Sequence, residues 1–195
     1  MIILASQSPR RRELLDSAGI PSTVRASHID ETILPGEDPV DYVCRMAREK
    51  AYAVAAGPRE IVLAADTTVV CDGQILGKPR DEDDARRMLS LLSGNSHTVI
   101  TGICLRHGSA ANVAHEKTEV WFTPLPPQEI DEYVATGEPM DKAGAYAIQG
   151  IASRYVPRIE GSHSNVVGLP ISLVWKELEK LRISAYPVAS TPEEV

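Results

Sequence analysis

Two arginines near the N-terminus have the type and position to bind an anion. Arg10 and Arg11 follow Ser8 and Pro9, which are typical of the N-cap and the first position of a helix. The helix dipole disfavours cations in this first turn, but each arginine precedes a leucine of the expected apolar stripe by four residues and so lies on the inward side. Guanidinium groups beside free backbone N–H groups favour an anion site. The alternatives are a solvated basic turn and pairing with buried carboxylates.

Two lysines beside apolar segments add to this positive charge. Lys50 falls about 20° from a valine of an apolar helical stripe, at the edge of that stripe; the alternative is a lysine that extends past the core into solvent. Lys78 follows an expected hairpin turn at Asp72-Gly73, and counting back across the turn places it opposite Thr67, next to Asp66. The alternative for Lys78 is an exposed position in a loop.

Asp66 interrupts the most apolar expected strand of the chain. A buried carboxylate needs a cation, a metal ion or hydrogen bonds, and desolvated carboxylates are typical of general bases and metal ligands. Glu31, in a polar loop, could complete a magnesium site with Asp66, because Mg²⁺ is commonly held by one or two carboxylates and substrate phosphates. The alternatives are a structural aspartate bonded to nearby backbone N–H groups and a solvated glutamate.

The composition narrows the class of partner. The 195 residues include 20 Lys and Arg against 27 Asp and Glu, for a net charge of −7, and aromatic residues make up 5%. A basic nucleic-acid surface and an aromatic platform for single strands are therefore not expected. No P-loop or G-x-G-x-x-G motif is present, and Ser8 lacks the G-x-S-x-G context of a nucleophile, so we expect it to cap the helix. The cations and carboxylates together suit a phosphorylated small molecule.

The sequence also bears on compartment and metal chemistry. It has no run of about 18 apolar residues, so no membrane span is expected, and the N-terminus lacks the charge order of a secretory signal. The three cysteines form no C-x-x-C pair and the five histidines no H-E-x-x-H, which argues against zinc and against a disulfide framework. With 43% hydrophobic and 24% charged residues, we expect a folded cytoplasmic protein.

Alternating strand and helix signals must position these side chains. Apolar runs predict strands over residues 2–5, 61–70, 98–105, 113–122 and 155–159, with 74–76 returning from the hairpin turn. Apolar stripes, caps and glycine stops predict helices over residues 9–18, 39–56, 81–92, 126–136 and 169–181. Residues 140–150 are rich in Gly and Ala and carry no clear signal.

Several short motifs, in order along the chain, resemble those of the Maf family. They are Leu4-Ala5-Ser6, Ser8-Pro9-Arg10-Arg11, Arg48-Glu49-Lys50-Ala51, Ala65-Asp66-Thr67, Gly77-Lys78-Pro79, Ser93-Gly94, the segment from Asp141 to Gly150, and Val166-Val167-Gly168-Leu169-Pro170. Each motif is short, but their joint occurrence from Met1 to about Leu181 is highly specific. One departure is His163, where the family pattern has Tyr.

The resemblance implies a fold and an assembly. The family has an α/β fold in which a long mixed β-sheet is flanked by helices and two lobes enclose a cleft, similar to inosine triphosphatases. It implies a single domain over residues 1–182. The two prolines and two terminal glutamates after Arg182 predict a loose tail over 183–195. It also implies a homodimer, a divalent metal cation (Mg²⁺ or Mn²⁺), and a small nucleotide as substrate, with no nucleic acid and no membrane as partner.

The resemblance assigns roles to individual residues. Asp66 matches the family's proton acceptor, and with Glu31 it matches metal-contacting positions. The positions associated with substrate choice are Arg10, Thr67 and Gln149, and those associated with phosphate binding are Ser8, Arg11, Lys50 and Lys78. The segment from Asp141 to Gly150 and the Ala65-Asp66-Thr67 motif are similar to the branch that acts on dTTP and UTP.

The implied activity is hydrolysis of the α–β phosphoanhydride of a nucleoside triphosphate, which would limit incorporation of modified nucleotides and could be linked to arrest of cell division. Two alternatives stay open. One is a nucleotide-binding regulator of septum formation without significant catalysis. The other is a house-cleaning pyrophosphatase for another nucleotide, such as 7-methyl-GTP or ITP.

Overall fold

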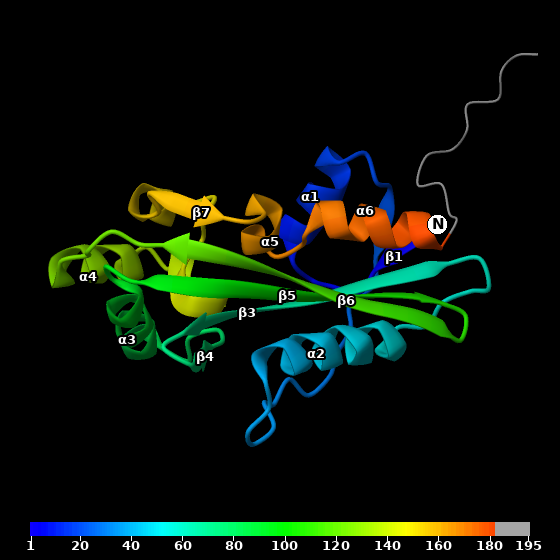
Figure 1. The fold of residues 1–195 in the computed structure, drawn as a ribbon, viewed down its shortest axis with the longest axis horizontal. Coiled ribbons are helices and arrows are strands. Elements are labelled where there is room, and N and C mark those ends of the chain that lie inside the picture. The colour runs from blue at the N-terminus through cyan, green and yellow to red at the C-terminus, as the bar shows by residue number, and fades with distance from the viewer. Residues whose placement is uncertain (182–195) are drawn as a thin grey trace, which may run out of the picture.

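The computed structural model describes residues 1–181, which form one seven-stranded mixed sheet (Figure 1). The strand order is β2-β1-β3-β5-β6-β7, and β4 pairs with β3 beside this path. β1 runs parallel to β2 and β3, and every other pairing is antiparallel. The strands are β1 (Ile2–Leu4), β2 (Ser22–Val24), β3 (Ile61–Cys71), β4 (Gln74–Leu76), β5 (Ser96–His107), β6 (Ala110–Trp121) and β7 (Arg158–Glu160). The expected mixed α/β architecture is confirmed.

Helices cover both faces of the sheet. In Figure 1, α1 (Pro9–Ser17), α5 (His163–Val167) and α6 (Ile171–Lys180) lie on one face and α2 (Pro39–Ala53) on the other. α3 (Glu82–Leu92) and α4 (Pro127–Ala135) gather at one end of the sheet, near three short 3₁₀ turns, η1 (Glu138–Asp141), η2 (Ala143–Ala145) and η3 (Ile151–Tyr155). Within residues 1–181, no helix has the length and apolar character needed to cross a membrane.

The long strand β3 is buried on both faces, so its side chains alternate between two cores. Ile61, Leu63 and Ala65 pack in the core on the α1 and α6 face, whereas Val62 and Ala64 pack in the core that includes α2. A strand has a side-chain period of two. The same alternation therefore turns Asp66 toward α2 and Thr67 toward α1.

One edge of β3 is open along the middle of the strand. β1 pairs with β3 as far as Leu63, and β4 pairs with it only from Val69 onward. Among the described residues, no strand pairs with residues 64–68 on this side. The gap between the two short strands leaves Asp66 and Thr67 at an opening in the sheet.

The hairpin after β3 forms as predicted. Asp72 and Gly73 both have positive φ, 48° and 73°, as the tight type I′ turn requires. Cys71 pairs with Gln74, in the expected register, but the pairing ends at Leu76. Lys78 therefore lies beyond the ladder, in the loop that leads to α3.

Several element boundaries differ from the sequence expectation. α2 ends at Ala53 rather than near residue 56, because the Arg106 guanidinium donates to the carbonyl oxygens of Ala51 (3.0 Å) and Val54 (2.7 Å). Tyr155 belongs to η3, so the last strand is shorter than expected. β2 and α5 are too short to give a periodic signal and were not expected. The tail predicted over residues 183–195 lies outside the described residues.

Candidate active site

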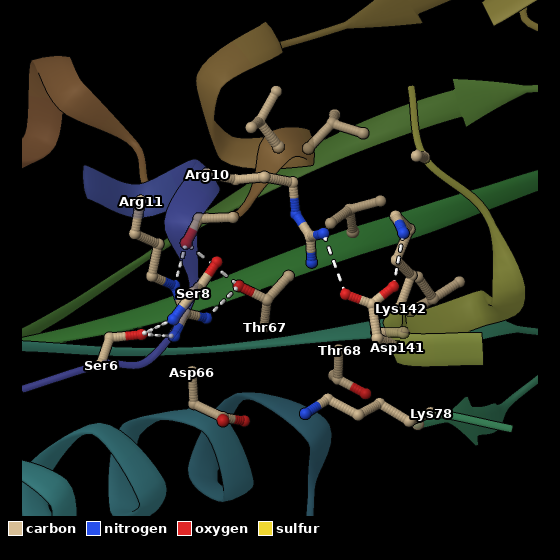
Figure 2. A pocket seen from close by; sticks show the side chains of 18 of the residues that line it. Ser6, Ser8, Arg10, Arg11, Asp66, Thr67, Thr68, Lys78, Asp141 and Lys142 are labelled. Atoms are coloured by element: carbon tan, nitrogen blue, oxygen red, sulfur yellow. Dashed lines mark hydrogen bonds and ion pairs between the residues drawn. The ribbon is translucent and has the colours of Figure 1, made fainter. Parts of the chain in front are cut away.

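A cleft of about 390 Å³ opens at the gap along β3. Its walls come from the β1–α1 turn, the middle of β3, the loop after β4, and residues 141–149 and 166–168. Every site residue expected from the sequence lines it. These residues are Ser8, Arg10, Arg11, Glu31, Lys50, Asp66, Thr67, Lys78 and Gln149. Segments that are far apart in the chain thus converge on one site (Figure 2).

On the α2 side of β3, Lys50 joins two carboxylates. Its Nζ lies 2.6 Å from Asp66 Oδ1 and 2.7 Å from Glu31 Oε1. Lys50 and Asp66 are only 8% and 7% exposed. The alternative of a lysine extended into solvent is therefore wrong. Burial raises the pKa of Glu31, but the hydrogen bond and charge of Lys50, together with nearby cations, outweigh burial and lower it.

Contacts with α2 hold the loop that carries Glu31. The Tyr42 hydroxyl donates to the Glu31 carbonyl oxygen at 3.1 Å. Arg45 donates to both carboxylate oxygens of Glu37, at 2.6 and 2.7 Å, and to the Thr32 carbonyl oxygen at 3.0 Å. These bonds anchor the Glu31 backbone and the residues that follow it, so its carboxylate stays within reach of Lys50.

On the α1 side of β3, Arg11 is held by neutral groups. It donates to the Gly168 carbonyl oxygen at 2.8 Å, to Ser6 Oγ at 3.1 Å and to Thr67 Oγ1 at 3.1 Å. Within residues 1–181, no carboxylate forms an ion pair with Arg11. Burial lowers the pKa of Arg11, but a guanidinium keeps its proton in proteins. The charges of Asp66 and Glu31 act on Arg11 through space, but the guanidinium has no direct ion-pair partner in residues 1–181 and can therefore bind an anionic ligand.

Ser8 occupies the N-cap position of α1 without capping it. Its backbone is extended (φ −67°, ψ 116°), but its side chain makes no capping hydrogen bond. The backbone N–H instead donates to Ser6 Oγ at 3.2 Å. The expected capping role of Ser8 is therefore wrong, and its hydroxyl is left for another partner in the cleft.

Arg10 bridges the cleft to a residue that sequence reasoning did not single out. Its Nη1 lies 3.3 Å from Asp141 Oδ2, and Figure 2 shows the two side chains pointing toward one another. Their side chains are 27% and 66% exposed. The alternatives for Arg10 were a solvated basic turn and pairing with a buried carboxylate. Arg10 does pair with a carboxylate, but Asp141 is exposed. Asp141 also lies beside Lys142 Nζ, another cleft residue that was not predicted individually.

The segment from Asp141 to Gln149 is fixed against β3 and the loop of Lys78. Gly144 has φ +70°, and a Cβ there would lie 2.8 Å from Val69 Cγ2. Its N–H donates to the Gly77 carbonyl oxygen at 3.1 Å. Lys78 follows directly and, in Figure 2, points toward Asp66. Close packing that only glycine allows thus places this segment beside Lys78.

The carboxylates in the cleft suit a hard divalent cation. Asp66 and Glu31 approach the same ammonium group, so their oxygens are no farther apart than the sum of the two bond distances. Oxygen donors of this type bind Mg²⁺ or Mn²⁺. In the described part of the chain, no group of three or more His, Cys, Asp or Glu could hold a metal alone. A cation here would need oxygens from a ligand or water as well.

The chain is similar to named bacterial proteins over most of its length. It is 55% identical over 192 residues to a dTTP/UTP pyrophosphatase of Anaeromyxobacter sp. (strain Fw109-5), covering 96% of this chain and 91% of the relative. It is 53% identical over 180 residues to a protein of the same name from Syntrophomonas wolfei, covering 91% and 95%.

Solved structures share the fold at low sequence identity. The Staphylococcus aureus Ham1 protein matches with a TM-score of 0.52 at 12% identity, over 92% of this chain and 98% of that chain. A HAM1 protein from Coxiella burnetii matches with a TM-score of 0.50 at 18% identity, over 90% and 98%. These likenesses support the fold.

The family assignment follows from a match that spans the whole described structure. Residues 1–181 match the family described as Maf-like protein. They contain every element that lines the cleft, including the β1–α1 turn and the middle of β3. The chain belongs to the Maf family.

Proposed function

We propose that the protein is a nucleoside triphosphate pyrophosphatase that hydrolyses dTTP and UTP to the nucleoside monophosphate and pyrophosphate. One observation carries the proposal: a buried carboxylate, Asp66, faces the same cleft as Arg11, a cation with no ion-pair partner in residues 1–181. A general base beside a phosphate-binding cation is what attack of water on a phosphoanhydride requires. Relatives that are 50–59% identical carry the name of this activity.

Asp66 accepts the proton of the attacking water. Lys50 holds Oδ1 at 2.6 Å, and no group in residues 1–181 is hydrogen-bonded to Oδ2. Oδ2 is therefore the atom that takes the proton as the water oxygen bonds to phosphorus and the α–β anhydride bond breaks. Lys50 holds the carboxylate in the orientation that turns Oδ2 toward the water.

The cations bind the triphosphate and stabilise the charge that develops on it. Arg11 is rigidly held by three hydrogen bonds, so little reorganisation is needed when phosphate oxygens arrive. Lys78 and the Ser8 hydroxyl face the same space. Asp66 and Glu31 would hold a divalent cation, which would supply Lewis-acid chemistry to the phosphate and the water.

Gln149 and Arg10 contact the nucleoside, and Thr67 acts through Arg11. Thr67 Oγ1 already bonds the Arg11 guanidinium at 3.1 Å and lies 3.0 Å from Thr101 Oγ1. Its contribution to substrate choice is therefore to position Arg11. Gln149 is exposed at the rim of the cleft, where its amide can pair with the polar edge of thymine or uracil.

The homodimer, the cytoplasmic location and a single domain over residues 1–182 are proposals that rest on the family resemblance. Light scattering on the purified protein tests the first: a mass near twice 21.2 kDa supports it. A mass of one chain contradicts it.

A panel of nucleotides tests the activity. The protein is incubated with dTTP, UTP, 7-methyl-GTP or ITP and Mg²⁺ or Mn²⁺, and pyrophosphate and orthophosphate are measured separately. We expect dTTP and UTP to turn over fastest, with pyrophosphate and monophosphate in equal amounts. Nucleotide binding without turnover would indicate the regulator, and faster turnover of 7-methyl-GTP or ITP the other house-cleaning enzyme.

A further inference from the structure

The backbone around Gln149 is held by two side chains that lie outside the cleft. The Ala147 N–H donates to the Tyr133 hydroxyl oxygen at 3.2 Å. The Ile151 N–H donates to the Glu138 carboxylate, 3.0 Å from Oε1 and 3.2 Å from Oε2. These N–H groups lie two residues before and two residues after Gln149. Both ends of its short segment are therefore tied to α4 and η1.

Tyr133 and Glu138 act as one unit. The Tyr133 hydroxyl donates to Glu138 Oε1 at 2.8 Å, and Tyr133 is 1% exposed. Burial, followed by the hydrogen bond to Glu138, raises the pKa of Tyr133, so its hydroxyl keeps the donated proton at neutral pH. The buried Tyr133 hydroxyl thus restrains the half-buried Glu138 carboxylate, and the two together restrain the segment.

Gly150 shows how closely the Glu138 carboxylate approaches this segment. A Cβ on Gly150 would lie 2.4 Å from both Glu138 Oε1 and Oε2, a distance that real Cβ atoms essentially never show. The backbone φ of Gly150 is −104°, so glycine is needed here for space rather than for a left-handed conformation.

Glu138 also contacts the start of the same cleft-lining segment. Its carbonyl oxygen accepts a hydrogen bond from Lys142 Nζ at 2.7 Å, and Lys142 lines the cleft. One residue thus holds Lys142 with its backbone and the Gln149 segment with its side chain.

We propose that Glu138, together with Tyr133, is a positioning residue that sets base selectivity by fixing Gln149 at the rim of the cleft. The inference rests on the proposed function, because it assumes that Gln149 reads the base. A misplacement of about 1 Å in such a group is enough to cost selectivity severely.

Steady-state kinetics on point variants test the proposal. Glu138→Ala should lower the ratio of kcat/KM for dTTP over dCTP by about tenfold or more, mainly through KM, because Asp66 is untouched. Glu138→Gln, which keeps an acceptor oxygen, should retain most of the ratio, and Tyr133→Phe should fall between. Glu132→Gln is the matched control, since Glu132 lies exposed on α4 and, within residues 1–181, its hydrogen-bond partner is Gln128 at 2.9 Å. All assays run well below each variant's melting temperature.

A double variant tests the contact itself. Gly150→Ala alone should impair selectivity as Glu138→Ala does, and in the Glu138→Ala background it should add little, because the clashing carboxylate is gone.

The outcomes separate this inference from the proposed function. If the wild type does not release pyrophosphate from dTTP, the proposed function fails. If the wild type does so and Glu138→Ala keeps its dTTP over dCTP ratio, the positioning role fails. Fully additive effects of Glu138→Ala and Gly150→Ala would also overturn it.

Discussion

The buried cations on the two faces of β3 have different partners. Toward α2, the Lys50 ammonium lies between the Asp66 and Glu31 carboxylates. Toward α1, the hydrogen-bond partners of the Arg11 guanidinium among residues 1–181 are a carbonyl oxygen and two hydroxyls. On the α2 side a cation is in direct contact with two carboxylates, whereas on the α1 side a cation has no ion-pair partner within the described residues and feels the charges of Asp66 and Glu31 only through space.

The two faces of β3 therefore suit different steps of phosphoanhydride hydrolysis. Direct contacts with Lys50 hold the Asp66 carboxylate in one orientation in the absence of ligand, which suits a base. An unpaired, preorganised cation is costly until a phosphate arrives, which suits binding. The alternation of Asp66 and Thr67 along β3 separates the two tasks by a single residue.

The largest effect on stability is expected when the α2 side of β3 loses the Lys50 ammonium. Lys50→Met leaves two carboxylates without a partner, one of them buried, and should lower the free energy of unfolding by about 3–5 kcal/mol. Urea denaturation at pH 7 measures this loss. Adding Asp66→Asn to Lys50→Met should recover part of it. A loss below about 1 kcal/mol would show that Lys50 does not stabilise the two carboxylates in the folded protein.

A buried base just behind the cleft wall extends the comparison, since its partner Tyr146 lines the cleft. The Nε2 of His97 lies 2.8 Å from the Tyr146 hydroxyl, and its Nδ1 has no partner among residues 1–181. Burial lowers the pKa of His97 to about 4, from 6.5. Between these values the unfolded chain binds a proton that the folded protein does not, so stability falls as pH falls.

The expected loss from His97 is about 3 kcal/mol between pH 6.5 and pH 4. Chemical denaturation of the wild type and of His97→Gln over this range measures it, because the variant should lack this part of the slope. Equal slopes in the two proteins would contradict the assignment of the loss to His97.

Removing Arg11 should change the free energy of unfolding in the opposite direction from removing Lys50. Arg11→Met takes a desolvated charge away and should raise the stability of the ligand-free protein by about 1 kcal/mol. It should also raise the KM for dTTP severalfold or more. Thermal melting with and without nucleotide checks both effects. Destabilisation comparable to that of Lys50→Met would mean that Arg11 is a structural ion.

The smallest effect is expected for the exposed pair across the cleft. Arg10→Ala removes a partly exposed ion pair with Asp141 and should change stability by less than about 0.5 kcal/mol, while raising the KM for dTTP. Arg12→Ala is the control, because Arg12 pairs with Asp16 at 3.6 Å on the exposed side of the same helix. Equal KM changes in the two variants would show that Arg10 makes no specific contribution to dTTP binding.

Local signals predicted the elements that position the cleft. The Asp72-Gly73 turn set the hairpin register, since its backbone geometry favours few other residues. A helix was predicted over residues 81–92, and α3 begins one residue later, at Glu82, because Asp81 is its N-cap and accepts from the Asp84 N–H. Asp66 stood out because a carboxylate in an apolar strand conflicts with its surroundings.

Contacts made by the backbone could not be predicted in this way. The Gly168 carbonyl oxygen holds Arg11 from 157 residues away, and a carbonyl oxygen is present at every position. Residues 140–150 gave no periodic signal because they form 3₁₀ turns in which Gly144 and Ala145 both have positive φ. Their shape depends on β3 and the loop of Lys78, which no local pattern encodes.

The division of work between the two faces is tested most directly with Asp66→Asn. The measurement is the rate of pyrophosphate release from saturating dTTP with Mg²⁺, with dTTP binding measured on the same protein. The asparagine can still accept the Lys50 hydrogen bond, so the variant should fold and bind dTTP within a few fold of the wild type. Its pyrophosphate release should fall by about a hundredfold or more. Near-normal release would contradict the account, because Asp66 would then not be the base.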